Sequence, residues 1–331
     1  MTNKEIKKPF KKIEEQINIL AKDRNLLISD IEDTKRKLSR YGYYEIVNGY
    51  KKHFMVDPYD DEAGFLKGIT FEHMYSLFEM DRNIRSRVME SIEIFESELK
   101  QAVAYTIAEQ ISDDQNKYIS RYHYNTGKKY YNRRIKKSVY PIDDLLRQMN
   151  HICSSETQPY KHYREQHGNV PPWILVKKLT FGNLIWWYKL LKSNERESVI
   201  AKIFGIPKSF INDDIRQMFG NILTLLLDYR NTAAHGGRIF NHHSSKHKLE
   251  YIKTLQDSLN VSPADYRNGK GQSRLGVLLK CLSLFENKEP AITLKVSIDY
   301  FLTSYMKLYS DDMFIYDEME ITQTELDNLL R

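Results

Sequence analysis

Three side chains that can bind and cleave a phosphodiester lie within six residues of one another, at Arg230, Asn231 and His235. The arginine is permanently charged, and its planar guanidinium can donate two hydrogen bonds to phosphate oxygens. The histidine can accept or release a proton near neutral pH, and the asparagine amide can orient either the substrate or the imidazole. Residues 230–235 are therefore the strongest candidate for chemistry in this chain.

The residues before this segment predict the helix that positions it. Apolar side chains recur at helical spacing at Ile215, Phe219, Ile222, Leu226 and Tyr229. Asn231 and His235 are four residues apart and share a face, whereas Arg230 and His235 are separated by roughly 140° on an ideal helix. Gly236 follows at once and favours a left-handed helix cap. We expect the three side chains to converge at the C-terminal end of a helix.

An arginine followed by a few residues and a histidine is a weak pattern by itself. The chain contains it again from Arg238 to His243. A polar helix terminus without catalytic function would explain either occurrence. The interpretation therefore depends on what surrounds the segment.

A basic and aromatic segment, residues 117–137, is the second candidate. It contains eight lysines and arginines, five tyrosines and no acid. Basic side chains attract backbone phosphates, and unpaired bases stack on tyrosine or arginine. The alternative is an exposed basic loop whose tyrosines pack on the protein. The residues predicted to bind RNA are Arg121, Tyr122, Lys128, Lys129, Tyr130, Tyr131, Arg133, Arg134, Lys136 and Lys137.

The chain resembles bacterial abortive-infection (Abi) proteins of the AbiD/AbiF type, which belong to the HEPN superfamily of helical ribonucleases and nucleotide-associated domains. The resemblance is carried by RNTAAHGGRIFN, beginning at Arg230, and by residues 38–54, 65–105 and 171–191. It implies that Arg230, Asn231 and His235 occupy active-site positions. Around the histidine the family often has a second His or a Cys-His pair, whereas this chain has Ala234 and Gly236.

The resemblance also implies an activity and partners. We expect a metal-independent endoribonuclease of phage defence that needs no cofactor and acts as a homodimer, with RNA as substrate. A structured regulatory RNA or a protein antitoxin could restrain it. Three residues beyond the motif histidine complete the predicted RNA contacts, namely Arg238, Asn241 and His242.

Periodicity and capping residues predict an all-α protein, because no segment shows sustained strand-like alternation. Helices are expected over 10–22, twice within 30–55 with a break near Gly42, and over 71–111 behind a Thr70 cap. Further helices are expected from Pro141 to Ile152, as a pair within 172–192, and over 247–260, 273–286 and 291–309. The resemblance implies a HEPN-like bundle with an N-terminal helical extension. We divide the chain into a lead, 1–60, a helical domain, 65–309, and an acidic tail, 310–331.

Composition limits the protein class and compartment. The chain has 331 residues and a net charge of +6, but its last 22 residues carry seven acids and one base. A basic body suits a polyanionic partner, which the tail could compete with or dock against. No apolar run is long enough for a membrane span and the N-terminus lacks an apolar signal region, so we expect a cytoplasmic protein. Cys153 and Cys281 are expected to be reduced core thiols.

Three interpretations remain open at this stage. The chain is an endoribonuclease, a non-catalytic RNA-binding component of a defence complex, or a metallohydrolase that uses His243 and His247, which have metal-ligand spacing on a helix. No nearby acid other than Glu250 completes that histidine pair, so we predict no metal site. The tryptophans at 173, 186 and 187 are expected in the core or in a subunit interface.

Overall fold

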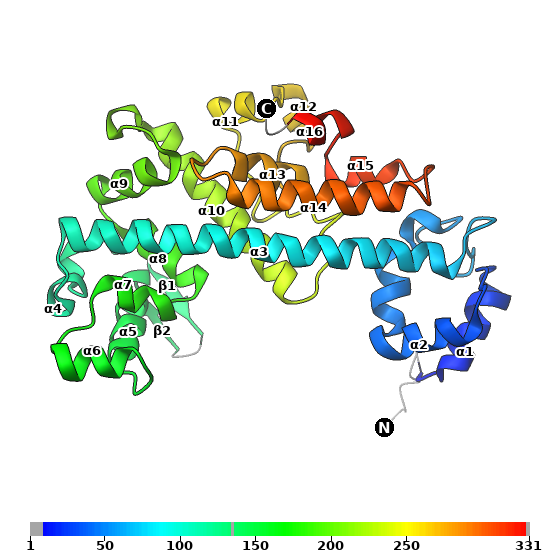
Figure 1. Ribbon diagram of the computed structural model, residues 1–331, viewed down its shortest axis with the longest axis horizontal. Coiled ribbons are helices and arrows are strands. Elements are labelled where there is room, and N and C mark those ends of the chain that lie inside the picture. The colour runs from blue at the N-terminus through cyan, green and yellow to red at the C-terminus, as the bar shows by residue number, and fades with distance from the viewer. Residues whose placement is uncertain (1–8, 134–135, 329–331) are drawn as a thin grey trace.

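A single long helix, α3 (Phe71–Gln110), is the axis of the molecule. The computed structural model describes residues 9–133 and 136–328, and in Figure 1 the other helices lie above and below α3. Its 40 residues correspond to a length of about 60 Å. Thr70 caps the helix by accepting a hydrogen bond from the His73 N–H at 2.9 Å, as predicted. The all-α class is confirmed.

Apolar side chains recur at helical spacing along α3 and form a ladder that is fully buried, namely Ile84, Val88, Ile92, Phe95, Leu99, Val103 and Ile107. Along this ladder α3 packs against three later helices, α9 (Ser193–Phe204), α10 (Asp213–Ala234) and α14 (Glu289–Met306). Phe95 stacks on Phe285 with ring centroids 4.7 Å apart. The centre of α3 is thus the common core of segments that are far apart in the sequence.

The N-terminal segment forms a separate lobe at the start of α3 (Figure 1). It contains α1 (Ile13–Asn18) with a π-helical extension over 19–23, α2 (Ile31–Tyr41), a π-turn over 44–48 and a 3-10 turn over 51–54. The predicted break falls at Gly42, whose φ of +85° is in the region that favours glycine.

A second lobe lies on the same side of α3, near the other end of that helix (Figure 1). Its helices are α4 (Gln115–Tyr118), α5 (Pro141–Cys153), α6 (Tyr160–His167), α7 (Pro172–Leu175) and α8 (Phe181–Leu190). It also holds an antiparallel hairpin of β1 (Tyr130–Asn132) and β2 (Lys137–Val139), with Tyr130 opposite Val139. These strands give no sequence signal, because three-residue strands are too short to show an alternating pattern.

The tryptophans differ in burial, whereas both cysteines are buried. Trp187 is fully buried and donates a hydrogen bond to the Tyr124 hydroxyl at 3.1 Å, whereas Trp173 and Trp186 are 41% and 47% exposed. Cys153 and Cys281 are both buried and unbridged, as predicted. Burial raises the pKa of the Cys281 thiol to about 12, so this thiol is an inert core group.

The helices after residue 252 lie on the opposite side of α3 (Figure 1). Besides α14 they are α11 (Lys253–Ser258), α12 (Pro263–Arg267), α13 (Leu275–Ser283), α15 (Phe314–Met319) and α16 (Gln323–Asn328). The helix expected over 247–260 was wrong in its first half, because the chain up to Ile252 follows an irregular path tied to α12 and α13. There Leu249 N–H donates to the Gln272 carbonyl at 2.8 Å.

Three acidic residues after position 309 form ion pairs with the body of the protein. Glu318 accepts a hydrogen bond from Arg274 at 2.8 Å, and Glu325 lies 2.7 Å from the Lys280 ammonium. Asp312 lies 2.7 Å from His73 on α3, and Ile315 and Met319 are fully buried. Ion pairs and apolar contacts together hold this segment on the helical core.

Candidate active site and nucleic-acid surface

Helix α10 carries the Arg230–His235 segment at its C-terminal end. Asn212 caps its start by accepting a hydrogen bond from the Ile215 N–H at 2.9 Å. Phe219, Ile222, Leu226 and Tyr229 are fully buried, which confirms most of the predicted stripe. Burial of this stripe against α3 and its neighbours fixes the direction in which the last turn of α10 presents its polar side chains.

The segment ends as the double glycine predicts. The helix stops at Ala234, His235 follows as the cap residue, and Gly236 has a left-handed φ of +76°. The His235 N–H still donates to the Asn231 carbonyl at 3.1 Å, so these residues remain one turn apart. Gly237 closes the turn by donating to the Thr232 carbonyl at 2.8 Å.

The three candidate side chains reach solvent. Asn231 and His235 are exposed and Arg230 is half-buried. Among the residues that the structure describes, none is a hydrogen-bond or ion-pair partner of these three side chains. The guanidinium, the amide and the imidazole are therefore available to a ligand. A helix terminus without function would not require three such groups to stay unpaired.

A buried carboxylate fixes the loop behind this segment. Asp81 of α3 is fully buried, and its Oδ1 accepts hydrogen bonds from the N–H groups of Ile239 and Phe240 at 3.0 and 2.7 Å. Its Oδ2 accepts a third bond from the Tyr50 hydroxyl at 2.5 Å. Burial raises the pKa of this carboxyl, while the three donors oppose that rise.

Two further arginines surround the glycine turn. Arg85, one turn after Asp81 on α3, donates to the Gly236 carbonyl at 2.9 Å and lies 3.4 Å from the Gly237 carbonyl. Arg238 donates to the Gly49 carbonyl in the N-terminal lobe. With Arg230, these groups concentrate positive charge at the end of α10, where the helix carbonyls carry partial negative charge.

Sequence reasoning missed Asp81, Arg85 and Tyr50, although one signal was present. Asp81 occupies a core position of α3, because Leu77, Ile84 and Val88 continue the same stripe and are fully buried. An acid at such a position requires hydrogen-bond partners from elsewhere in the chain. That signal indicates a tethering role but cannot say which segment is tethered.

The predicted contacts beyond the motif differ in their availability. Arg238 is exposed but engaged with Gly49, and the backbone carbonyl of Asn241 accepts a hydrogen bond from Arg274 at 2.9 Å. His242 is half-buried, with its Nε2 2.8 Å from an Asp228 carboxylate oxygen. His247 lies 3.8 Å from the other oxygen of Asp228.

The histidine pair considered as a metal site is not arranged as its spacing suggested. His243 and His247 lie in an irregular segment, so the helical spacing that would align them does not apply. Within residues 9–133 and 136–328, no group of three or more His, Cys, Asp or Glu side chains could hold a metal ion.

The basic segment lies on the surface. Most of its predicted RNA-binding side chains are exposed, namely those of Arg121, Tyr122, Lys128, Lys129, Tyr130, Tyr131, Arg133, Lys136 and Lys137. Arg134 lies outside the described residues. Two buried tyrosines of the segment, Tyr118 and Tyr124, belong to the core instead, where Tyr124 donates to the Tyr118 carbonyl at 2.6 Å.

Acids at the start of α5 neutralise part of this surface. Arg121 lies 3.2 Å from Asp143, and Tyr130 donates a hydrogen bond to Asp144. Although burial opposes it, hydrogen bonds from Tyr130 and Asn132 keep the pKa of Asp144 below its ordinary value. Lys128, Lys136 and Lys137, in contrast, are exposed and have no ion-pair partner among the described residues.

The end of α10 and the hairpin lie on the same side of α3. In Figure 1 the chain after α10 emerges below α3, between the lobe that carries the hairpin and the N-terminal lobe. Helix α8 connects the two regions, because its Lys189 ammonium donates to the Thr224 hydroxyl of α10 at 3.0 Å. A nucleic acid on this side could contact both regions.

The fold and the exposed polar cluster define an all-α protein with a candidate phosphodiester site. A family model described as Abi-like protein matches residues 36–241, which is more than half of the chain. The chain belongs to the Abi-like protein family. The matched range contains Asp81, the hairpin and the whole of residues 230–235. The family suggests a role in abortive-infection defence. Comparisons with curated proteins and with solved structures found no match.

Over the part of the chain that the structure describes, no helix is both long enough and apolar enough to span a membrane.

Replacing Asp81 tests the tether behind the motif. We expect Asp81→Ala to lower the free energy of unfolding by about 3 kcal/mol, because three buried donors lose their acceptor. Asp81→Asn should cost about 1 kcal/mol, since its amide oxygen can still accept both backbone N–H groups. Urea denaturation followed by circular dichroism measures both values. Equal losses for the two variants would contradict the role assigned to the carboxylate oxygen.

The glycine turn can be tested with two glycines associated with α10. A Cβ built on Gly237 would lie 2.6 Å from Thr232 Cγ2 and 3.0 Å from its carbonyl oxygen, whereas one on Gly220 has no neighbour within 4 Å. Gly237→Ala should therefore lower the free energy of unfolding by about 2 kcal/mol. Gly220→Ala should raise it by up to about 1 kcal/mol through helix propensity. Thermal unfolding in which both variants shift in the same direction would refute this geometry.

Proposed function

We propose that the protein is a metal-independent, HEPN-type endoribonuclease that acts in abortive-infection defence against phage. The observation that carries the proposal is the set of Arg230, Asn231 and His235 at a solvent-facing helix end, whose side chains have no hydrogen-bond or ion-pair partner among the described residues. Arg85 and Arg238 beside this helix end, and the exposed hairpin lysines on the same side of α3, support an anionic substrate. Membership in the Abi-like family supports the biological role.

The proposed reaction uses the ribose 2′-hydroxyl as nucleophile. This oxygen loses its proton and attacks the adjacent phosphorus, while the bond to the 5′-oxygen breaks and that oxygen gains a proton. The products are a 2′,3′-cyclic phosphate and a 5′-hydroxyl. His235 carries one of the two protons. Arg230 stabilises charge on the phosphoryl oxygens, and Asn231 orients the linkage or the imidazole.

The two proton transfers are most simply shared between two histidines. Within one chain, His242 is the histidine nearest to His235 in sequence. It is half-buried, and its Nε2 is already paired with Asp228. Two copies of His235 facing one another across a homodimer would supply both an acid and a base. A homodimer is therefore part of the proposed active form.

A non-catalytic function is the second candidate, and the basic hairpin favours it. The hairpin exposes lysine, arginine and tyrosine side chains on strands separate from α10, so RNA could bind there without cleavage. In that case a structured RNA or a protein partner would hold the chain in a defence complex. The two functions are separated by asking whether bound RNA is cut.

His235→Ala should abolish RNA cleavage and leave RNA affinity unchanged. Loss of a positioned acid or base reduces a rate by about 100- to 10,000-fold. The measurements are cleavage of labelled single-stranded RNA on a denaturing gel and binding by fluorescence anisotropy. The matched control is His243→Ala, because His243 is exposed and lies in the same region.

The same cleavage assay includes EDTA. Unchanged wild-type cleavage in EDTA is expected, and its loss would overturn the metal-independent mechanism. Cleavage that persists in His235→Ala would remove this residue from the mechanism. Stoichiometric bound RNA that wild-type protein never cuts would support the non-catalytic function instead.

Neutralising the hairpin should weaken RNA binding in a salt-dependent way. The variant replaces four exposed bases by glutamine, at Lys128, Lys129, Arg133 and Lys137. Each lost phosphate contact should reduce the slope of log affinity against log salt by about 0.7 for a single strand. The control replaces four exposed lysines elsewhere, at Lys22, Lys253, Lys270 and Lys307.

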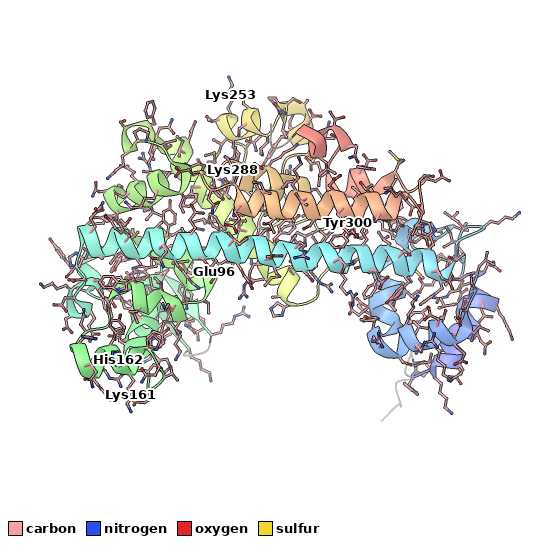
Figure 2. All side chains as sticks on the ribbon, in the orientation of Figure 1. Glu96, Lys161, His162, Lys253, Lys288 and Tyr300 are labelled. Carbon is pink, nitrogen blue, oxygen red and sulfur yellow. The ribbon has the colours of Figure 1, made fainter. Side chains whose placement is uncertain are left out.

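This control matches the change in net charge. Figure 2 shows Lys253 on the side of α3 opposite the hairpin lobe. Equal losses of affinity in the two variants would mean that only overall charge matters, and the hairpin would lose its assigned role.

A further inference from the structure

A cavity of about 520 Å³ opens between the hairpin, α5 and α8. One wall is formed by β1 with Tyr130, a second by the first half of α5 with Gln148, and a third by α8 with Asn183 and Trp186. The cavity adjoins the basic segment and takes Tyr130 and Asn132 from it, and the basic residue in its lining, Arg147, is paired with Asp144. Its composition therefore indicates what part of a nucleic acid it can receive.

The cavity presents an accessible tryptophan. Trp186 is 47% exposed, whereas its neighbour Trp187 is fully buried, and Tyr130 on the facing wall is 42% exposed. Large aromatic rings left half in solvent lose favourable burial that a flat ligand can restore. Base stacking on such rings is a common way for proteins to hold single-stranded nucleic acid.

The polar groups of the cavity suit a base edge better than a phosphate. The side-chain amides of Asn183 and Gln148 have no partner among the described residues, and each can both donate and accept hydrogen bonds. Asp144 also lines the cavity and is paired with Arg147, so this wall offers no free positive charge to a phosphate. Phosphates would stay outside, near exposed hairpin bases such as Lys137.

The cavity is connected to the candidate active site through α8. Gly182 of α8 faces α10, where the Cδ1 of Leu227 would lie 3.9 Å from a Cβ built on this glycine. Leu227 is one helical turn before Asn231. One strand could therefore place a base against α8 and a phosphodiester at the end of α10.

We infer that the cavity beside Trp186 is a binding subsite for an unpaired nucleobase of the RNA strand. The inference rests on the proposed function, because it takes RNA as the ligand of this side of the molecule. The base stacks on the Trp186 indole, and its edge faces the amides of Asn183 and Gln148. Bases that are paired in a duplex cannot enter, so the subsite selects single strands.

The test compares two tryptophans of similar exposure in a His235→Ala background, which prevents cleavage. The variants are Trp186→Leu and, as control, Trp173→Leu on α7, which is 41% exposed and does not line the cavity. The ligands are a labelled oligouridine and an abasic ribose-phosphate strand of equal length. Fluorescence anisotropy gives both affinities.

We expect Trp186→Leu to weaken oligouridine binding by about tenfold and to leave abasic binding unchanged. Trp173→Leu should alter neither affinity, and Trp186→Phe, which keeps a stacking surface, should retain most of the affinity. Oligouridine should quench tryptophan fluorescence in the parent protein but not in Trp186→Leu. Should Trp186→Leu fail to fold, Trp186→Phe and Gln148→Ala carry the test, with a measurable loss expected only for Gln148→Ala.

The possible outcomes separate this inference from the proposed function. If Trp186→Leu binds both ligands as the parent does, the base subsite is wrong, while cleavage that depends on His235 can still stand. If the parent chain with His235 never cleaves RNA but shows the Trp186-dependent difference between the ligands, the ribonuclease proposal fails and the base subsite stands. Equal weakening of both ligands would also overturn the subsite, because it would indicate general damage to the surface.

Discussion

The structure depends on one buried carboxylate. Asp81 lies in the middle of the core-facing stripe of α3, yet it is an acid, and its three hydrogen bonds come from two distant parts of the chain. It joins the N-terminal lobe, the central helix and the loop after the motif at a single point. Tyr50 strengthens the junction by stacking on Phe240, with ring centroids 5.8 Å apart. A charge in this position is costly to bury unless every donor is in place, so the junction favours one arrangement over looser alternatives.

At the candidate site a fixed backbone carries side chains that have no internal partner among the described residues. The chemistry proposed for the site depends on this combination. The backbone around the glycine turn is held by Asp81 and Arg85, whereas Arg230, Asn231 and His235 keep their hydrogen-bonding capacity for a ligand. Groups held on a rigid support need little reorganisation when charge develops on a bound phosphate, which is the condition for efficient electrostatic stabilisation. In the proposed function, the cluster of guanidinium groups would draw an anionic strand to the same place before any reaction occurs.

Local features could be predicted from the sequence because their causes are local. The Thr70 cap, the break at Gly42 and the end of α10 each follow from one or two residues, and the buried stripe of α10 follows from its spacing. The junction at Asp81 could not be assigned, because it joins residues 158 positions apart and leaves no periodic trace. The hairpin strands are too short to alternate visibly, and the path of residues 247–252 is set by contacts with α12 and α13. The cavity beside Trp186 combines three elements whose proximity only the fold determines.

The bond between Arg274 and Glu318 has a consequence for the order of events during synthesis. Arg274 also holds the backbone carbonyl of Asn241, just beyond the motif, so residues from the last part of the chain brace the loop that Asp81 anchors. A nascent polypeptide that has passed His235 but has not reached position 318 lacks this brace. The groups proposed to cut RNA are thus translated well before the residues that support them. On the ribosome, the site therefore stays incomplete until late in elongation.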